Sequence, residues 1–205
     1  MAAFAGGEML KPGITLYFVR HGETDWNRVG RYQGQRDIPL NATGRSQAAR
    51  NGRVLAELLG AMAASLDYVA SPLARARETM EIVRGELGLP PLGYRTDDRL
   101  REIHYGHWEG QLWLELPQTD PDGYAARRAD PWNWQPTGGE SYRMLSERVA
   151  GWLAGMANDA VVVSHGGVSK VLRGLVLQLG ATEIASLEVP QDKVLRVTAG
   201  SVGWV

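Results

Sequence analysis

Three apolar runs along the chain have the length and composition of buried β-strands. Residues 14–19 are β-branched or aromatic at most positions, and residues 160–163 are continuously apolar, as in strands buried on both faces of a parallel sheet. Residues 66–70, which are apolar or aromatic except at Asp67, predict a further short strand. Each run is followed by a polar or turn-forming sequence. In chain order these sequences are Arg20-His21-Gly22, Ser71-Pro72 and Ser164-His165-Gly166. We therefore expect three strands that carry polar side chains at their carboxyl ends.

Segments with helical periodicity follow these strands. Apolar residues fall near one helical stripe between 43 and 60, where Thr43 can cap the start and Gly60 the end. Residues 75–86 form a second expected helix, and a third begins at Val168. Strands that alternate with helices predict an α/β sandwich, and such sheets bind ligands in the crevice beyond the carboxyl ends of the strands. The three polar sequences should meet there.

The remaining segments suggest one domain with two irregular parts. Residues 1–13 are small and Gly-rich and end in Pro12-Gly13, which predicts a loose N-terminal leader. Residues 14–205 are expected to form a single domain. Within it, residues 109–140 hold four prolines and four tryptophan or tyrosine residues, and we expect them to form a lid-like excursion over the sheet.

Composition excludes several classes of partner. The chain has 205 residues, with 22 Lys and Arg against 23 Asp and Glu, so its net charge of −1 gives no reason to expect a nucleic acid or an anionic membrane as partner. It contains no cysteine, which excludes disulfides, thiolate nucleophiles and Cys-ligated zinc. No apolar run approaches the ~18 residues of a membrane span, and a cytoplasmic protein is expected.

The polar sequence after the first strand carries the first chemical signature. Arg20-His21-Gly22, with Asn27 six residues after His21, resembles the signature of the histidine phosphatase (phosphoglycerate-mutase-like) superfamily. This resemblance implies a three-layer α/β/α sandwich with a mostly parallel central sheet. It also implies that His21 is the nucleophile that carries phosphate, with Arg20 beside it.

Further motifs continue the resemblance in the same order along the chain. It assigns Arg75 to the phosphate pocket, Glu102 to general acid catalysis and His165 to the side of the pocket opposite the nucleophile. Two arginines beside His21 should lower the pKa of its imidazole and so keep it neutral for attack. The residues that the resemblance assigns to phosphate or substrate binding are Asn27, Gln33, Gly34 and Gly166.

Two competing assignments concern the segment around Glu102. Glu109 is a second carboxylate, but the Trp-Glu-Gly turn that contains it is usually structural in the family. His104 and His107 are three residues apart, a spacing that could suggest two metal ligands. Gly106 disfavours a regular helix there, and the family works without metal. No metal and no cofactor are therefore expected.

These residues predict an enzyme that hydrolyses a small phosphomonoester through a phosphohistidine intermediate. A cofactor-dependent phosphoglycerate mutase is the alternative, since Arg127 and Arg128 could imitate its carboxylate-binding arginines. Ile103 and Trp113 stand where such mutases carry basic residues, which favours the short phosphatase branch. A non-catalytic phosphate-binding protein is the third and weakest reading. The expected partner is a small phosphorylated metabolite, and the sequence leaves the metabolite and a homodimer open.

Overall fold

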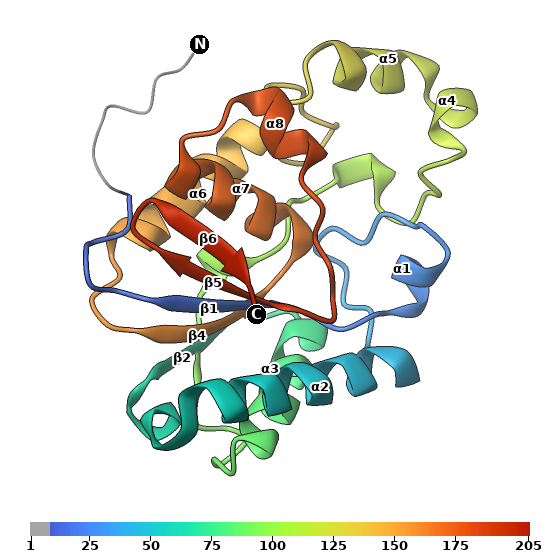
Figure 1. Ribbon diagram of the computed structural model, residues 1–205. Helices are drawn as coiled ribbons and strands as arrows, with labels where there is room; N and C mark the ends of the chain where they lie inside the picture. Colours follow the sequence, from blue (N-terminus) through green and yellow to red (C-terminus); the bar gives the residue numbers. More distant parts are fainter. Residues whose placement is uncertain (1–8) are drawn as a thin grey trace.

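A six-stranded sheet forms the centre of the protein (Figure 1). The computed structural model describes residues 9–205. The strand order is β3-β2-β4-β1-β5-β6; the first four strands run parallel, while β5 and β6 are antiparallel to their neighbours. The strands are β1 (Leu16–Arg20), β2 (Asp67–Ala70), β3 (Arg95–Thr96), β4 (Ala160–Ser164), β5 (Val194–Thr198) and β6 (Ser201–Trp204).

Helices cover both faces of this sheet (Figure 1). The helices α2 (Ala42–Leu59) and α3 (Ala74–Glu86) lie on one face, and α6 (Tyr142–Ala154) and α7 (Gly166–Leu177) lie on the other. The prediction of an α/β sandwich with a mostly parallel sheet is confirmed. The shorter helices are α1 (Asp25–Arg28), η1 (Gly60–Ser65), η2 (Asp98–Leu100), η3 (Gly106–Trp108), α4 (Leu116–Thr119), α5 (Pro121–Ala129) and α8 (Ala181–Ser186).

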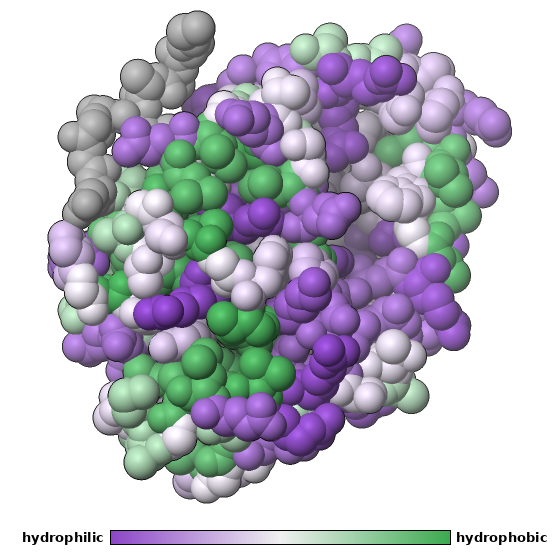
Figure 2. Space-filling view, viewed as in Figure 1, coloured by the Kyte–Doolittle hydropathy of each residue, from purple (hydrophilic) through white to green (hydrophobic). Residues whose placement is uncertain are grey.

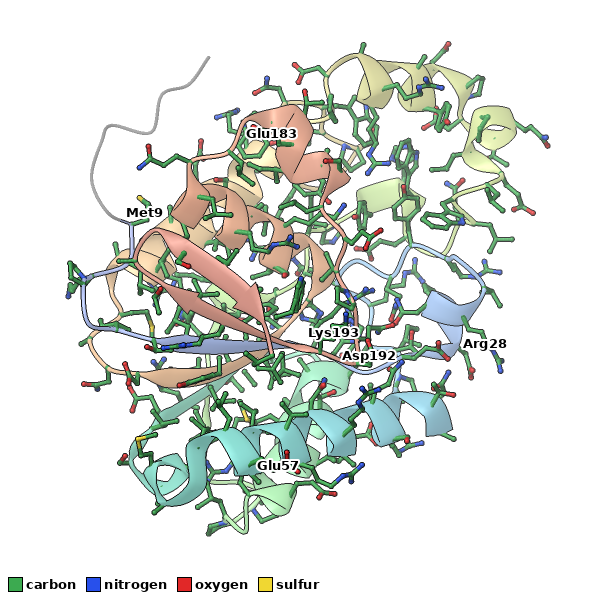
Figure 3. The ribbon with its side chains drawn as sticks, viewed as in Figure 1. Met9, Arg28, Glu57, Glu183, Asp192 and Lys193 are labelled. Carbon is green, nitrogen blue, oxygen red and sulfur yellow. The ribbon has the colours of Figure 1, made fainter. Side chains whose placement is uncertain are left out.

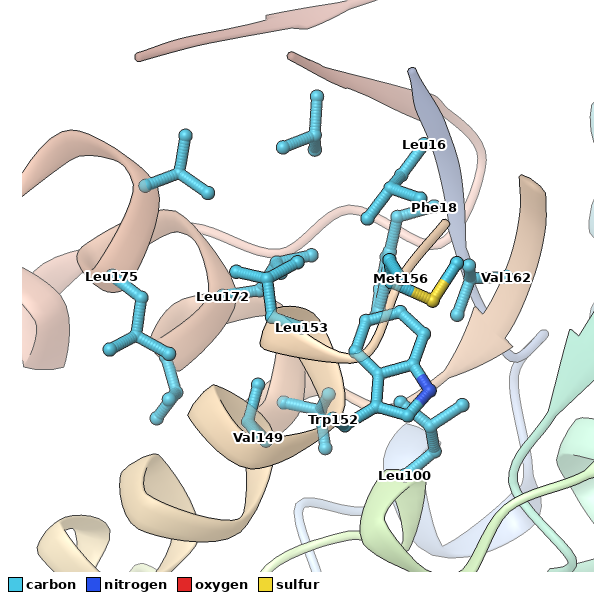
Figure 4. Close-up of a cluster of buried hydrophobic side chains, with 14 of the residues drawn as sticks. Leu16, Phe18, Leu100, Val149, Trp152, Leu153, Met156, Val162, Leu172 and Leu175 are labelled. Carbon is cyan, nitrogen blue, oxygen red and sulfur yellow. The ribbon is translucent and has the colours of Figure 1, made fainter. Parts of the chain in front are cut away.

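The side chains of β1 alternate between two apolar clusters, as the two-residue period of a strand requires. Leu16 and Phe18 pack in the cluster under α6 and α7, which also contains Trp152 (Figure 4). Tyr17 and Val19 face the opposite cluster, under α2 and α3. The central strands β1 and β4 are therefore buried on both faces.

Several element boundaries differ from the prediction for local reasons. Asn41, and not Thr43, caps α2, because its Oδ1 accepts the Gly44 amide at 2.9 Å. Helix α7 begins at Gly166, two residues before the predicted start, with His165 at the N-cap position. The excursion at 109–140 contains α4 and α5. Two of its four prolines, Pro117 and Pro121, lie in the first turn of these helices, where a backbone N–H donor is not needed.

The predicted leader lies partly outside the described residues, because residues 1–8 are not described. Within its remainder, Leu10 is only 1% exposed and belongs to the apolar cluster under α6 and α7. The packed domain therefore begins before the predicted boundary at Gly13. No helix in the described part of the chain is long and apolar enough to span a bilayer.

Candidate active site

The carboxyl ends of three parallel strands bring the first polar residues together. Arg20 on β1 is in register with Ser164 on β4, and the His21 amide donates to the Ser164 carbonyl at 2.9 Å. The Ser71 amide, after β2, donates to the Val163 carbonyl at 2.9 Å. As a result, the ring centroids of His21 and His165 lie 5.1 Å apart, as the convergence of strand ends predicts.

Hydrogen bonds on both ring nitrogens fix the proton of His21. Its Nδ1 lies 2.8 Å from the Gly22 carbonyl oxygen, which can only accept, so Nδ1 carries the proton. Its Nε2 accepts from Nε of Arg75 at 3.2 Å. The neutral ring therefore presents an unprotonated Nε2. Gly22 is needed beside it, because a Cβ there would lie 2.1 Å from the Gly44 carbonyl oxygen.

The pKa of His21 lies well below its usual value, so the imidazole is neutral near pH 7. Burial is the largest cause, followed by the positive charges of Arg75 and then Arg20. The predicted direction is confirmed, but desolvation contributes more than the arginines to which the sequence attributes it. The side chain is 2% exposed.

Arg75 is anchored by two carbonyl groups as well as by His21. Its Nη1 donates to the Arg36 carbonyl and its Nη2 to the Gly34 carbonyl, both at 2.7 Å. Burial lowers the pKa of Arg75 to about 10, partly opposed by the Glu102 carboxylate, so the guanidinium stays charged at neutral pH. Gly34 has φ +53, and a Cβ there would lie 1.9 Å from Oε1 of Glu109. Gly34 therefore contacts Arg75 through its backbone carbonyl and leaves room for the Glu109 carboxylate.

The Arg20 side chain lies beside the start of α7, whose first residue is Gly166. Arg20 donates from Nη1 to the Val189 carbonyl at 2.6 Å, and its buried Nε has no hydrogen-bond partner among the described residues. Burial lowers the pKa of Arg20. A Cβ on Gly166 would lie 3.5 Å from that Nε, so the start of α7 faces the same space.

Glu102 is 9% exposed and is held by backbone amides. Its Oε1 accepts from the Ile103 amide at 2.9 Å and from the Gly167 amide at 3.0 Å. A Cβ on Gly167 would lie 2.5 Å from Oε1, so a glycine at this position of α7 lets the carboxylate approach. Glu109 is instead enclosed: its Oε1 accepts from the Gln35 and Tyr105 amides, as expected for a structural carboxylate.

His165 is completely buried, and its ring contacts the Ser71 hydroxyl. The Ser71 Oγ lies 2.7 Å from Nε2 of His165 and accepts from the Leu73 amide at 3.3 Å. Among residues 9–205 the Ser71 hydroxyl has no acceptor for its proton other than Nε2 of His165, so it donates there, and the proton of the neutral imidazole lies on Nδ1. This Nδ1 has no partner in the described part of the chain, and burial lowers the pKa of His165 well below its usual value.

A cavity of about 360 Å³ opens in front of His21. Figure 2 shows the surface hollowed between the α4–α5 segment and the body of the molecule. Two predicted site residues, His165 and Gly166, do not line the cavity. The lining residues are Arg20, His21, Asn27, Gly30, Arg31, Tyr32, Gln33, Gly34, Arg75, Glu102, Tyr105, Trp113 and Gln191.

Two amide side chains near His21 differ in whether their oxygen atom already accepts a hydrogen bond. Asn27 Oδ1 accepts from the Thr24 amide at 3.1 Å, in a capping box at the start of α1. Gln33 is 7% exposed, and its Oε1 has no hydrogen-bond partner among residues 9–205. Gln33 therefore has a buried polar atom available for a ligand, whereas Asn27 Oδ1 is already used.

Gln191 was missed at the sequence level. Its Nε2 donates to the His21 carbonyl at 3.0 Å, and its own carbonyl accepts from Asn51 Nδ2 at 3.0 Å. Figure 3 shows the adjacent Asp192 in the same loop, on the side of the sheet that faces α1. No motif marks this glutamine in the sequence, because only the fold brings the loop before β5 against His21.

The segment after Glu102 has mainly structural contacts. His104 Nδ1 accepts from the Gly106 amide at 2.9 Å, while His107 Nε2 lies 3.0 Å from Oδ2 of Asp120, so the two histidines have different partners. Among residues 9–205, no group of three or more His, Asp or Glu side chains is placed to hold a metal ion. Arg127 donates to the Tyr32 hydroxyl at 2.8 Å.

The two buried histidines predict that the free energy of unfolding falls as pH drops below about 6.5. Because the folded state lowers the pKa of both His21 and His165, the unfolded chain binds more protons below this pH. Stability should be fully present above about pH 6.5 and fall by roughly 1.4 kcal/mol per pH unit for each histidine. Urea unfolding between about pH 7.5 and 5.5 measures the slope. His165→Asn should reduce it, and a flat profile would contradict the burial argument.

Comparison with known proteins identifies the family. Residues 16–205 match the model described as "Histidine phosphatase superfamily (branch 1)". The chain is 34% identical over 176 residues to a glucosyl-3-phosphoglycerate phosphatase of Mycolicibacterium vanbaalenii, covering 80% of this chain and 74% of that protein. It is also 34% identical over 170 residues to a metal-independent phosphoserine phosphatase of Arabidopsis thaliana, covering 80% and 68%.

The fold comparison agrees with these matches. A mycobacterial glucosyl-3-phosphoglycerate phosphatase solved with VO3 superimposes with a TM-score of 0.76 at 32% identity, covering 94% of this chain and 96% of that one. The sequence motifs, the sheet and the relatives thus agree on one family. The chain therefore belongs to branch 1 of the histidine phosphatase superfamily and is a phosphatase of that family.

Proposed function

We propose that the protein hydrolyses a small phosphomonoester through a phosphohistidine on Nε2 of His21. One observation carries this proposal: the imidazole is buried and neutral, and its unprotonated Nε2 meets the charged Arg75 guanidinium at the cavity. A nucleophile for phosphoryl transfer needs both an available lone pair and positive charge near the transferring oxygens. Both are built into this position before any substrate arrives.

In the first step, Nε2 of His21 forms a bond to phosphorus as the ester P–O bond breaks. Glu102 gives its proton to the departing alkoxide, which leaves as an alcohol. The Nε–H of Arg75, which meets Nε2 in the free protein, then donates to a phosphoryl oxygen. In the second step, water gives a proton to Glu102 and its oxygen attacks phosphorus, the P–N bond breaks and inorganic phosphate leaves. Glu102 is again protonated for the next turnover.

The other groups around His21 are proposed to hold phosphate oxygens. Arg20 has an unpartnered buried Nε, and His165 has an unpartnered Nδ1 that the Ser71 hydroxyl keeps protonated. An unpaired buried donor is costly, and a bound oxyanion would relieve both. We assign the same task to the Gly166 amide. The free Oε1 of Gln33 can only accept, so we assign it to a donor group of the substrate; Asn27 lines the cavity, and Gly34 acts through Arg75.

The mutase alternative receives no support from Arg127, one of the two arginines that suggested it. Arg127 is occupied by the Tyr32 hydroxyl and stacks over the Trp108 ring, with its Cζ 5.7 Å from the centroid. Ile103 is buried in the apolar core. We therefore expect phosphate release to exceed isomerisation in an assay run with and without bisphosphoglycerate. A bisphosphoglycerate-dependent isomerisation faster than phosphate release would overturn the proposal.

Activity is expected to survive metal chelators and to be blocked by vanadate. The two guanidinium groups of Arg20 and Arg75 supply the positive charge that a metal supplies in other phosphatases. Vanadate adopts the five-coordinate geometry of the transition state and should bind the same groups more tightly than phosphate does. Phosphate release with and without a chelator measures the first effect. Loss of activity in chelator that zinc or magnesium restores would contradict the proposed charge balance.

The substrate is proposed to be a small phosphorylated metabolite. The glucosyl-3-phosphoglycerate and phosphoserine named for two relatives are of this kind, and the cavity of about 360 Å³ has room for a leaving group beside the phosphate. We further propose that residues 109–140 act as a lid-like wall of the single domain, because Trp113, from this segment, lines the cavity.

A further inference from the structure

Trp113 is a large apolar side chain that the fold leaves in water at the edge of the cavity. It is 57% exposed, yet it lines the same cavity as His21 and Arg75. Its neighbour Leu114 is 81% exposed and does not line the cavity. An exposed tryptophan beside a polar catalytic pocket is a feature that binding, rather than folding, explains best.

Backbone hydrogen bonds hold Trp113 in this position. Residues 30–32 and 110–113 form a short ribbon: the Trp113 amide donates to the Gly30 carbonyl at 3.0 Å, and the Tyr32 amide donates to the Gln111 carbonyl at 3.0 Å. Gly30 has φ +71, and a Cβ on it would lie 2.4 Å from Nε1 of the indole. The indole therefore rests against a residue that must be glycine, which restricts its orientation.

The other aromatic rings near the cavity have partners, whereas Trp113 has none. Tyr32 and Tyr105 have ring centroids 4.4 Å apart, and Trp108 and Trp134 have centroids 4.3 Å apart. These four rings pack on one another and account for their own burial. In the described part of the chain, no ring or guanidinium stacks on Trp113. A face of its indole is therefore available to a ligand.

We propose that Trp113 is a platform for the leaving group of the substrate, and that this leaving group contains a ring with a flat apolar face. The inference rests on the proposed phosphatase function, because the phosphate must sit at His21 for the leaving group to extend along the cavity. The C–H face of a sugar ring and the face of an aromatic ring both fit an indole. Short open-chain alcohols cannot cover it.

A set of alkyl phosphates with similar leaving groups tests the proposal. The ring-bearing esters are glucose 6-phosphate and 2-phenylethyl phosphate, and the ringless esters are ethyl phosphate and glycerol 3-phosphate. In Trp113→Ala, the ratio of kcat/KM for ring-bearing to ringless esters should fall about tenfold, which is about 1.4 kcal/mol. The loss should appear mainly in KM, because stacking is the same in the ground and transition states.

Two matched variants sharpen the result. Trp113→Phe keeps a flat ring and should retain most of the preference, whereas Leu114→Ala, which removes a more exposed neighbour outside the cavity, should leave the ratio unchanged. Of the two ring-bearing esters, the one whose kcat/KM falls more in Trp113→Ala shows whether the indole prefers a sugar ring or an aromatic ring. If the wild-type enzyme forms phosphohistidine but Trp113→Ala leaves the ratio of kcat/KM unchanged, this inference is overturned and the proposed function is not. Failure of the wild type to form phosphohistidine would instead remove the proposed function beneath it.

Discussion

His21→Ala is expected to reduce kcat by at least about 10⁴-fold, because His21 is the one imidazole among the described residues that line the cavity and is proposed to accept the phosphoryl group. No other side chain that lines the cavity combines a neutral imidazole lone pair with contact to Arg75. Loss of the ring also leaves the Nε–H of Arg75 without its acceptor. Phosphate release from an activated ester, measured under saturating conditions, gives the size of the effect.

His107→Ala is the matched control for this substitution. Its side chain is 41% exposed, lies beside Asp120 and does not line the cavity, so kcat should change little. Melting temperatures show whether either variant is damaged in its fold. A correctly folded His21→Ala protein that keeps more than about a tenth of the wild-type kcat would contradict the role of His21.

Glu102→Gln is expected to slow esters of poor leaving groups by roughly 10²–10⁴-fold, the range of general acid catalysis. An alkoxide needs a proton as it departs, and the Glu102 carboxyl is the acidic side chain that lines the cavity. Esters of nitrophenol should suffer much less in the first step, because nitrophenolate leaves without a proton. Dephosphorylation also uses Glu102, so phosphohistidine should accumulate in this variant.

The structure makes a folding defect a weak explanation for such a loss. A glutamine oxygen at position 102 can still accept from the Ile103 and Gly167 amides that hold Oε1 of the glutamate. Glu109→Gln is the comparison, because Glu109 supports backbone amides and does not line the cavity. Its losses should be independent of the leaving group. Equal losses across leaving groups in a folded Glu102→Gln protein would remove Glu102 from the acid role.

The strands that carry the site could be predicted because they are buried on both faces. The continuous apolar run that became β4 and the β-branched run that became β1 are long enough to recognise, and each ends directly before a histidine. The outer strands gave weaker signals. β3 has two residues, and β5, which pairs antiparallel with β1 and β6, has the exposed Arg196 at its centre, so neither resembles a continuous buried strand.

The residues proposed to be catalytic could be named from motifs, but their supporting contacts could not. A motif fixes residue types near one strand end, whereas the bond from Ser71 to His165 joins side chains 94 positions apart, and the bond from Gln191 to the His21 carbonyl spans 170 positions. Such contacts depend on which strands are neighbours in the sheet. The size of the burial effect on the His21 pKa depends on the same packing, which a local pattern does not contain.

The proposed mechanism is tested most directly by identifying the residue that carries phosphate during turnover. Wild-type and Glu102→Gln protein would be mixed with nitrophenyl phosphate, denatured in alkaline detergent within seconds and digested, and the phosphorylated peptide located by mass spectrometry. We predict one phosphoryl group on His21 that is stable to base and labile to acid. NMR of the phosphorylated protein should show that it is attached at Nε2. More of it should be present in Glu102→Gln. Phosphate on a serine, or hydrolysis at full rate with no phosphorylated His21 in either protein, would contradict the phosphohistidine mechanism.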